Sequence, residues 1–247
     1  MSILHQLRKI FWRTGFDVCA FDAASNNLAR KQEIFRKFGI NIVLDVGANE
    51  GQFGRHIRHD LDYKGRIISF EPLSSAFEKL QKSAASDSLW QVDKFALGDD
   101  ERETTINIAL NSVSSSILEM ARTHLNSVPS SRFVGTEKVR VKTLDSIFGE
   151  ICSTNDNVFL KIDTQGFENK VLQGAYRSLD RISTIQLELS LVELYRGEAT
   201  FGEMFGQMRQ KGYDLISIEP VYFGEIPGQI LQVDGIFHRV RNGDRDL

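Results

Sequence analysis

Three short segments place acidic side chains and glycines where an apolar run ends and a helical pattern begins. The first segment, from Asp45 to Gly51, has the spacing D-x-G-x-N-x-G and follows the apolar run 40–46. Gly47 permits a tight turn and close approach of a ligand to the backbone, and Gly51 permits close packing as the next helix starts. The Asp45 carboxylate can meet an amine, and free N–H groups at a helix N-terminus can bind a carboxylate. The segment therefore predicts a site for a ligand that carries both groups.

The second segment ends the apolar run 66–70 with Glu71, 20 residues after Gly51. An acidic residue there can accept both hydroxyl protons of an adenosine ribose, although NAD-binding proteins use the same arrangement. A dinucleotide site would show the spacing G-x-G-x-x-G, which differs from the spacing found here. We therefore expect S-adenosylmethionine, whose amino-acid part carries an amine and a carboxylate, as the cofactor. Its predicted binding residues are Asp45, Gly47, Asn49, Gly51, Glu71, Asp163 and, flanking the adenine, Pro72 and Leu97.

The third segment ends the run 157–162 and supplies the predicted catalytic residues Asp163 and Lys161, to which Glu188 from a later run is added. The Asp163 carboxylate could face the sulfonium end of the cofactor, orient a substrate hydroxyl or hold a metal. Lys161 lies on the same side of the strand by its two-residue period, and it either joins the chemistry or only forms an ion pair with Asp163. Glu188, near the end of the run 183–189, either reaches the same crevice or is an ordinary solvated or salt-bridged side chain.

The carboxylates of the third segment and the residues of the last strand allow few further assignments. Asp163 and Glu188 together could hold a divalent cation, but none of the five histidines forms a ligand cluster with them. A divalent metal is therefore unsupported, and no metal-binding residue is assigned. Asp234 and His238 are expected to be structural. The aromatic side chains of Tyr195, Tyr222 and Phe223 could stack an acceptor, although most aromatics should lie in the core.

The elements that must position these residues alternate between strand and helix. Apolar runs at 40–46, 66–70, 90–96, 157–162 and 183–189 alternate with helical patterns that include 27–38, 52–59, 74–84 and 201–210. This alternation predicts an open, doubly wound α/β sheet with helices on both faces. The last two strands, 214–218 and 231–238, have no helix between them and should form an antiparallel hairpin. The ligand crevice is expected at the C-terminal strand ends, covered by an irregular insertion at about 104–142.

Composition and charge exclude several other classes of protein. The 247 residues are 41% hydrophobic and 26% charged, with a net charge of −3 and no basic block, which argues against a nucleic-acid partner. No apolar run approaches the roughly 20 residues of a membrane span, and no secretory signal is present. The two cysteines have no metal-ligand spacing and are expected to be reduced and buried. A cytoplasmic protein without integral membrane association is expected.

The N-terminal residues 1–35 are predicted to be a helical extension, followed by one catalytic domain over 36–247. Within the extension, apolar residues recur at helical spacing, with basic residues between them: Ile3, Leu4, Leu7, Ile10 and Phe11. Such a helix most often packs on its own domain or on a partner subunit, for example in a homodimer. Binding to a membrane surface is the less favoured alternative, because the segment is short.

The motifs together resemble the FkbM-type methyltransferases from about Asn41 to Arg239. The resemblance rests on VLDVGANEGQF, ISFEPL, FALGD, VKTLDSIF, LKIDTQGFENKVLQGA, LELSLVELY and VDGIFHR. It implies a class I methyltransferase (Rossmann-like) fold, with a seven-stranded, mostly parallel sheet whose last strand is antiparallel. It also implies O-methylation of a hydroxyl with S-adenosylmethionine. The chain departs from the family in having Gln165 where Glu is frequent, and Ser83 near a frequent Asn.

The predicted function is transfer of a methyl group to a hydroxyl of a sugar, in a polysaccharide or glycolipid, or of a polyketide-type acceptor. An alcohol is a poor nucleophile at neutral pH, so a base should assist, and Asp163 is the candidate. The N/D-P-P-Y/F motif of enzymes that methylate exocyclic amines is absent after the run 157–162. Two alternatives stay open: an NAD-dependent oxidoreductase or epimerase, and a catalytically silent methyltransferase-like binding module.

Overall fold

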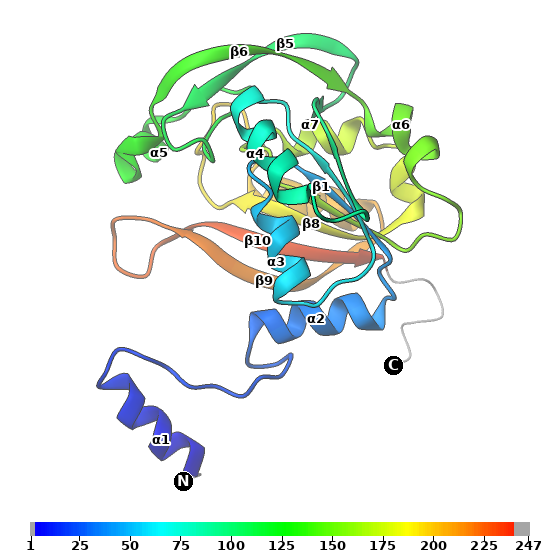
Figure 1. The fold of residues 1–247 in the computed structure, drawn as a ribbon. Coiled ribbons are helices and arrows are strands. Elements are labelled where there is room, and N and C mark those ends of the chain that lie inside the picture. The colour runs from blue at the N-terminus through cyan, green and yellow to red at the C-terminus, as the bar shows by residue number, and fades with distance from the viewer. Residues whose placement is uncertain (1–2, 240–247) are drawn as a thin grey trace.

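A computed structural model describes residues 3–239 and contains a twisted, seven-stranded sheet with helices on both faces (Figure 1). The strand order is β3-β2-β1-β7-β8-β10-β9, and β10 is antiparallel to both of its neighbours. This confirms the predicted class I methyltransferase fold and its terminal hairpin. The strands are β1 (Ile42–Val46), β2 (Arg66–Phe70), β3 (Trp90–Asp93), β7 (Val158–Ile162), β8 (Ile182–Ser190), β9 (Tyr213–Phe223) and β10 (Ile230–Arg239).

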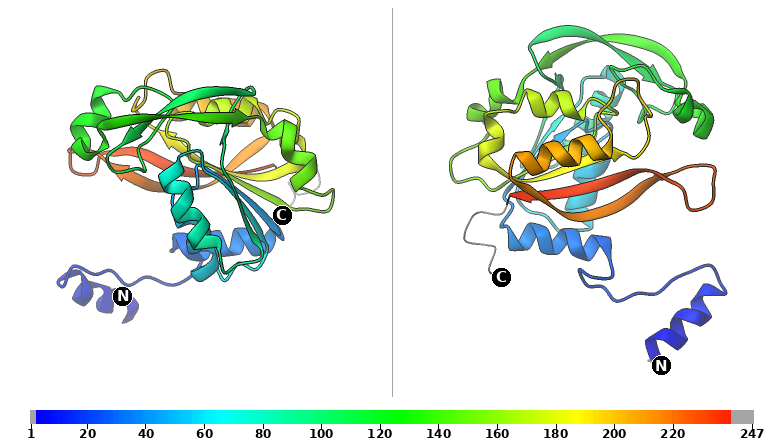
Figure 2. Two further views of the ribbon diagram at one scale, coloured as in Figure 1. Left: turned by 45° about the horizontal axis from the view of Figure 1, so that its top comes forward. Right: turned by 180° about the vertical axis from the view of Figure 1, so that it is seen from behind.

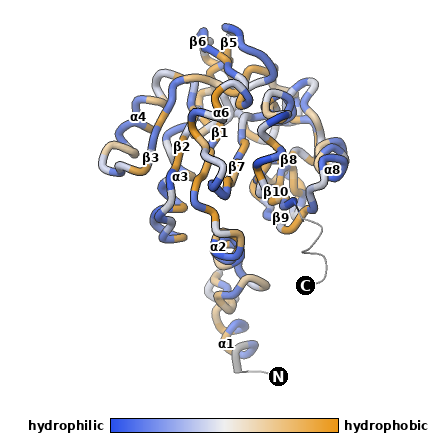
Figure 3. The backbone as a smooth tube through the Cα atoms, turned by 90° about the vertical axis from the view of Figure 1, so that its right-hand side faces the viewer, coloured by the Kyte–Doolittle hydropathy of each residue, from blue (hydrophilic) through white to orange (hydrophobic). Residues whose placement is uncertain are grey.

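Two sets of helices bury the two faces of this sheet. One face packs against α2 (Asn27–Lys37), α3 (Gln52–His59) and α4 (Ser74–Ala84), and the other against α6 (Leu144–Ile151), α7 (Glu168–Gln173) and α8 (Phe201–Gln210). Side chains of β1 alternate between the two faces of the sheet. Val43 packs in the hydrophobic core under α2, α3 and α4, and Leu44 packs in the core under α6, α7 and α8. Hydrophobic residues accordingly concentrate on the central strands (Figure 3). Strands buried on both faces explain the nearly continuous apolar runs in the sequence.

The register of the central strands brings their C-terminal ends to one edge. Val46 at the end of β1 pairs with Phe70 at the end of β2 and with Ile162 at the end of β7. The residues that follow these three strands therefore lie side by side. This register places the glycine-containing turn between two acidic strand ends.

The predicted third strand and the predicted irregular insertion both require correction. Strand β3 ends at Asp93, and the short β4 (Ala96–Leu97) belongs to a separate sheet with β5 (Arg102–Ala109) and β6 (Phe133–Lys142). Strands β5 and β6 are antiparallel over most of their length and arch above the C-terminal edge of the large sheet (Figure 1). The insertion thus supplies β5 and β6 to an ordered three-stranded sheet, and the connection between these two strands contains α5 (Arg122–Ser127). The helix α6 that follows was not predicted.

The N-terminal helix α1 (Ile3–Trp12) stands apart from the rest of the molecule in both views of Figure 2. Its described apolar side chains, Leu7, Ile10, Phe11 and Trp12, are exposed by 42% to 62%, so the expected packing on its own domain is not found for these residues. Its polar contacts are local, such as the ion pair of Arg8 with Asp17. A homodimer through this helix stays a prediction. The predicted boundary between residues 35 and 36 falls inside α2, and the domain division stays a prediction too.

The two cysteines differ in their exposure to solvent. Cys152 is buried in the core, whereas Cys19 is exposed, which corrects the expectation of two buried thiols. Among residues 3–239, no helix combines the length and apolar character needed to cross a membrane. The outer ends of the two predicted domains, residues 1–2 and 240–247, lie outside the described residues.

Candidate active site

A cavity of about 700 Å³ opens at the C-terminal edge of the large sheet, between this edge and the insertion. The volume lies within the range of about 300–1,000 Å³ typical of small-molecule sites. Its walls come from the turns after β1, β2 and β7, from the start of β10 and the end of β9, from the first turns of α2 and α3, and from the insertion. This is the crevice that the strand order predicts.

The turn after β1 passes so close to the end of β7 that only glycine fits at position 47. Gly47 has φ +76°, and a Cβ added there would lie 1.8 Å from the carbonyl oxygen of Asp163. The Asp163 N–H in turn donates to the carbonyl of Val46 at 3.1 Å. Gly51, with φ +84°, begins α3 against Leu80. Gly47 therefore allows the turn to lie directly beside Asp163.

Glu71 lines the cavity at the end of β2 and accepts a backbone hydrogen bond on each carboxylate oxygen. The N–H of Asn49 donates to Oε2 at 2.8 Å, and the N–H of Leu73 donates to Oε1 at 2.9 Å. Burial raises the pKa of Glu71 to about 7, although these two N–H groups act in the opposite direction. Each carboxylate oxygen has a second acceptor position, so the group can accept two further donors from the cavity.

Both predicted adenine-flanking residues lie in the wall of the same cavity. Pro72 follows Glu71 directly, and Leu97 in β4 comes from the second sheet. Phe70 and Leu73 add apolar surface beside them. The structure thus offers an apolar slot next to the Glu71 carboxylate, and contact of Pro72 and Leu97 with an adenine stays a prediction.

Asp45 was predicted to meet the cofactor directly, but the structure places it elsewhere. Its side chain is 0% exposed and does not line the cavity. Its Oδ2 accepts from the Ser69 hydroxyl at 3.1 Å, and that hydroxyl accepts from Nε1 of Trp90 at 3.0 Å. Position 45 alternates with Leu44 and Val46 along β1, so its side chain points to the face covered by α3 rather than to the strand end. Asp45 therefore acts on the site through its neighbours.

Lys161 is the neighbour that connects Asp45 to the cavity. Its Nζ lies 3.4 Å from Oδ1 of Asp45 and 3.2 Å from Oδ2 of Asp163. Burial alone would lower the pKa of Lys161, but the carboxylates of Asp163, Asp45 and Asp234 outweigh it and raise the pKa. The ammonium is thus held in its charged form by a buried pair of carboxylates. The expected ion pair with Asp163 is present, and Lys161 also lines the cavity.

Asp163 and Glu188 are brought together at the same wall, joined by an amide. Nε2 of Gln165 donates to Oδ1 of Asp163 at 2.9 Å and to Oε2 of Glu188 at 2.7 Å. Glu188 also accepts from Nε2 of Gln232 at 3.0 Å. Burial, followed by the negative charges of Asp163, Glu168 and Asp234, raises the pKa of Glu188 well above its usual value. Gln165, which sequence reasoning noted only as a departure from the family, is therefore the link between the two carboxylates.

A divalent cation between Asp163 and Glu188 would have to displace this amide. Within residues 3–239, no group of three or more His, Cys, Asp or Glu side chains is arranged to hold a metal ion. The amide nitrogen is a donor and cannot ligate a metal beside its two acceptors. The arrangement as it stands suits proton transfer and hydrogen bonding rather than cation binding.

Several cavity residues were missed or assigned a structural role. Asp234 in β10, which was expected to be structural, lines the cavity, and burial raises its pKa to about 6. His238, in contrast, stacks on Phe38 at 3.5 Å between ring centroids, away from the cavity wall. His124 from α5 and Lys31 from α2 also line the cavity. Neither has a local sequence signal, because each comes from an element outside the strand-turn motifs.

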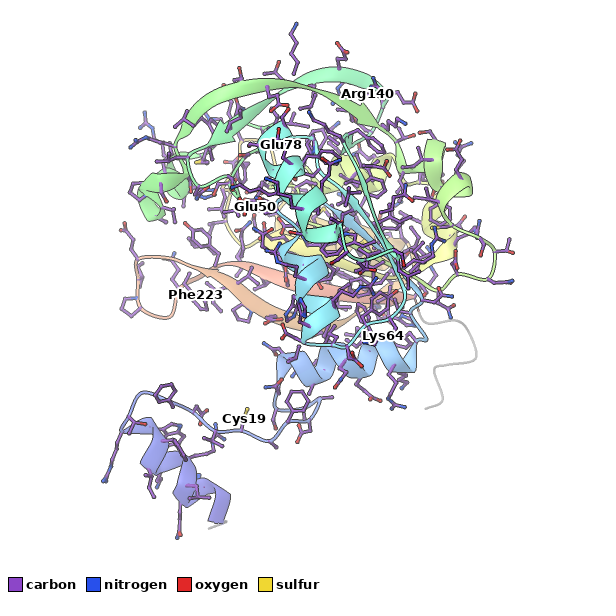
Figure 4. All side chains as sticks on the ribbon, in the orientation of Figure 1. Cys19, Glu50, Lys64, Glu78, Arg140 and Phe223 are labelled. Atoms are coloured by element: carbon purple, nitrogen blue, oxygen red, sulfur yellow. The ribbon has the colours of Figure 1, made fainter. Side chains whose placement is uncertain are left out.

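The three aromatic residues suggested for acceptor stacking lie at different positions relative to the cavity. Tyr222 lines the cavity, whereas Tyr195 is fully buried behind it. Phe223 is 57% exposed and projects from the β9–β10 hairpin, outside the cavity wall (Figure 4). Of the three, only Tyr222 is placed to touch a bound acceptor.

The fold and this site define a class I methyltransferase-type protein. The model of the family described as "Methyltransferase FkbM domain" matches residues 45–215. The chain belongs to the FkbM methyltransferase family. No curated protein matches the chain.

Several solved structures are similar to the chain at low sequence identity. The FkbM methyltransferase of Methylobacillus flagellatus has 15% identity and a TM-score of 0.51, over 81% of this chain and 43% of that one. The chain thus spans less than half the length of that relative. A putative tRNA (m1A22) methyltransferase of Streptococcus pneumoniae has 10% identity and a TM-score of 0.44, over 87% and 73% of the two chains. The N-terminal domain of human METTL16, in complex with SAH, has 9% identity and a TM-score of 0.46, over 87% and 70%.

Proposed function

We propose that the chain is an S-adenosylmethionine-dependent O-methyltransferase. The observation that carries the cofactor assignment is the Glu71 carboxylate, with one free acceptor position on each oxygen facing the cavity. A ribose offers two adjacent hydroxyl donors to such a group. The Gly47 turn, together with Glu71 and Asp163, lines the cavity, so a ligand can approach its backbone there. Glu71, Pro72, Leu97 and the turn would hold the cofactor.

The acceptor side of the cavity is rich in hydrogen-bonding groups from the insertion. The cavity wall contains both these insertion residues, Asn111, Ser112, Ser114 and Ser131, and the carboxylates of Asp163, Glu188 and Asp234. Alcohol groups can both donate to carboxylates and accept from hydroxyls and amides. These walls support a polyhydroxylated acceptor, such as a sugar of a polysaccharide or glycolipid, or a polyketide-type alcohol.

Asp163 is the residue that would take the proton from the acceptor hydroxyl. S-adenosylmethionine, when bound, supplies an activated methyl group and leaves as a neutral thioether. The Asp163 side chain is 32% exposed to the cavity while Lys161 and Gln165 fix both of its oxygens. General-base assistance of this kind contributes about 10²–10⁴-fold, and alignment of the reacting groups contributes more. The carboxyl group of Glu188, which lines the same wall beside Gln165, would help to orient the acceptor hydroxyl.

A methyl-transfer assay with a panel of hydroxylated acceptors tests this proposal. The purified chain is incubated with S-adenosylmethionine and with oligosaccharides, glycolipids or polyketide alcohols. Release of S-adenosylhomocysteine is measured together with the mass of the acceptor. The proposal requires one added methyl group on an oxygen, and a much slower reaction for Asp163→Asn. Methylation of an acceptor nitrogen would contradict it. Cofactor binding without transfer to any acceptor would favour the silent binding module.

A further inference from the structure

The cavity contains a lysine, Lys31, whose side-chain nitrogen has no carboxylate within ion-pair distance among the described residues. It lies on α2, its side chain is 8% exposed, and it forms part of the cavity wall. Among the described residues, its Nζ has neither a hydrogen bond nor an ion pair, and its recorded contact is with the Phe53 ring, 5.7 Å from the centroid. An unpaired buried charge is costly unless a ligand or water compensates it. A lysine in this position therefore indicates an anionic ligand group.

The second lysine of the cavity is not available for such a ligand. Lys161 lies 5.4 Å from the centroid of the same Phe53 ring, so the two ammonium groups flank one side chain. However, Asp45 and Asp163 already pair with Lys161 at 3.4 and 3.2 Å. Burial lowers the pKa of Lys31, and the negative charges of Asp234 and Glu219 act in the opposite direction, although neither carboxylate lies within ion-pair distance. Of the two cavity lysines, Lys31 is thus the one that has no paired carboxylate among the described residues.

Lys31 and Glu71 lie on opposite sides of β1, so they would contact different parts of a bound ligand. Glu71 follows β2, on one side of β1, whereas the charges that act on Lys31 belong to β7, β9 and β10, on the other side. Phe53, the ring beside Lys31, lies in the first turn of α3, directly after the glycine turn. An elongated ligand with its ribose on Glu71 and its chain across this turn would bring its far end to Lys31.

We propose that Lys31 binds the carboxylate of the cofactor's amino-acid part. This inference rests on the proposed function, because it takes S-adenosylmethionine as the ligand. The cofactor carries two positive groups and one negative group, and the wall carboxylates Glu71, Asp163, Glu188, Asp234 and Glu219 outnumber the two lysines. Among the described residues that line the cavity, Lys31 is the lysine without a paired carboxylate, and it is therefore available to the negative group. Helix α2, which lies outside the residues matched by the family model, is in this way part of the cofactor site.

The test compares two ligands that differ in the amino-acid part. S-adenosylhomocysteine carries the carboxylate, and 5′-methylthioadenosine keeps the adenosine and the sulfur but lacks it. Affinities of both are measured by calorimetry for the full chain, Lys31→Met and Lys31→Arg. Lys37→Met, an exposed lysine in the last turn of the same helix, is the control. Thermal unfolding of each variant establishes that it is folded.

The inference predicts that Lys31→Met weakens S-adenosylhomocysteine binding by about 10-fold to 100-fold, as for loss of a charged hydrogen bond. Binding of 5′-methylthioadenosine should change by less than about threefold, and Lys31→Arg should restore part of the loss. Unchanged S-adenosylhomocysteine affinity in Lys31→Met overturns the inference and leaves the proposed function intact; this is also the result expected if Lys31 serves an anionic acceptor. Equal losses for both ligands overturn it as well, because Lys31 would then be structural. Failure of the unmodified chain to bind S-adenosylhomocysteine overturns both proposals.

Discussion

The hydroxyl of Tyr195 donates a 2.7 Å hydrogen bond to Oε1 of Gln165 and so determines which way the Gln165 amide faces. With Oε1 held in this way, Nε2 points to the carboxylates of Asp163 and Glu188. Tyr195 itself is fully buried, and its hydroxyl also lies 3.1 Å from the carbonyl of Ser114 in the insertion. One buried phenol therefore connects the acceptor side of the cavity with the orientation of the predicted base.

Removal of this hydroxyl should affect turnover more than binding. In Tyr195→Phe the Gln165 amide loses the bond that orients it, and a buried polar group is left unsatisfied at a cost of about 1–3 kcal/mol. We expect kcat to fall by roughly 3-fold to 30-fold, with little change in cofactor affinity. Steady-state kinetics, calorimetry and thermal unfolding measure the three quantities. Tyr176→Phe, at a 69% exposed position, is the matched control. An unchanged kcat in a destabilised Tyr195→Phe would assign the phenol a purely structural role.

Asp163→Asn tests the assignment of the general base. The amide keeps the size of the side chain, while Lys161 retains Asp45 as its counter-charge. We expect kcat to fall by about 10²–10⁴-fold, with cofactor affinity changed less than about threefold. Asp62→Asn, on an exposed loop residue whose side chain is 78% accessible, is the control. Equal losses in turnover and affinity would show that Asp163 serves in binding and is not the base.

Glu71 predicts a pH dependence of cofactor binding. Burial raises its pKa to about 7, so below that pH the carboxyl in the free protein is largely protonated. Accepting two ribose hydroxyls requires the ionised form, so affinity should rise with pH up to about 7 and then level off. Titrations with 5′-methylthioadenosine between about pH 5.5 and about pH 8.5 measure this, because that ligand has no amino-acid group to titrate. Glu71→Gln should bind weakly and without this slope. Affinity that increases toward low pH would contradict the ionised role.

Gly47→Ala tests the close approach of the two strand ends. The added Cβ would collide with the Asp163 carbonyl, and the backbone at Gly47 has φ +76°. We expect a loss of at least about 2 kcal/mol in the free energy of unfolding, together with impaired cofactor binding. In the exposed helical Gly202, by contrast, an added Cβ meets nothing within 4 Å. Gly202→Ala should be neutral or stabilising by up to about 1 kcal/mol. A Gly47→Ala variant as stable as Gly202→Ala would show that this contact is not rigid.

The strand-turn motifs were predictable because their signals are local. The bounds of β2, α3 and α4 agree with the sequence patterns, since each apolar run is closed by glycine, proline or a polar turn. The same reasoning placed Glu71, Asp163 and Glu188 at the C-terminal strand ends, where the register brings them to one cavity.

The remaining features depend on tertiary geometry. Asp45 has the spacing of a ligand-binding residue but points to the face under α3, which only the pleat of β1 decides. Asp234 lies early in its strand and still lines the cavity, because β10 is antiparallel and its first half lies at the C-terminal edge of the others. Lys31 looks like a solvated lysine of an amphipathic helix until α2 is packed against the sheet. The pairing of β4 with β6 joins residues that are far apart in the sequence, so no local pattern indicated that β3 ends before Ala96.

A calorimetric titration with S-adenosylmethionine, S-adenosylhomocysteine and NAD tests the central claim most directly. Glu71→Ala is compared with Glu78→Ala, an exposed position on α4 that Figure 4 marks on the outer surface. We predict roughly micromolar binding of the first two ligands, lost in Glu71→Ala and kept in Glu78→Ala, with no binding of NAD. Binding of NAD alone, or of none of the three, would contradict the account.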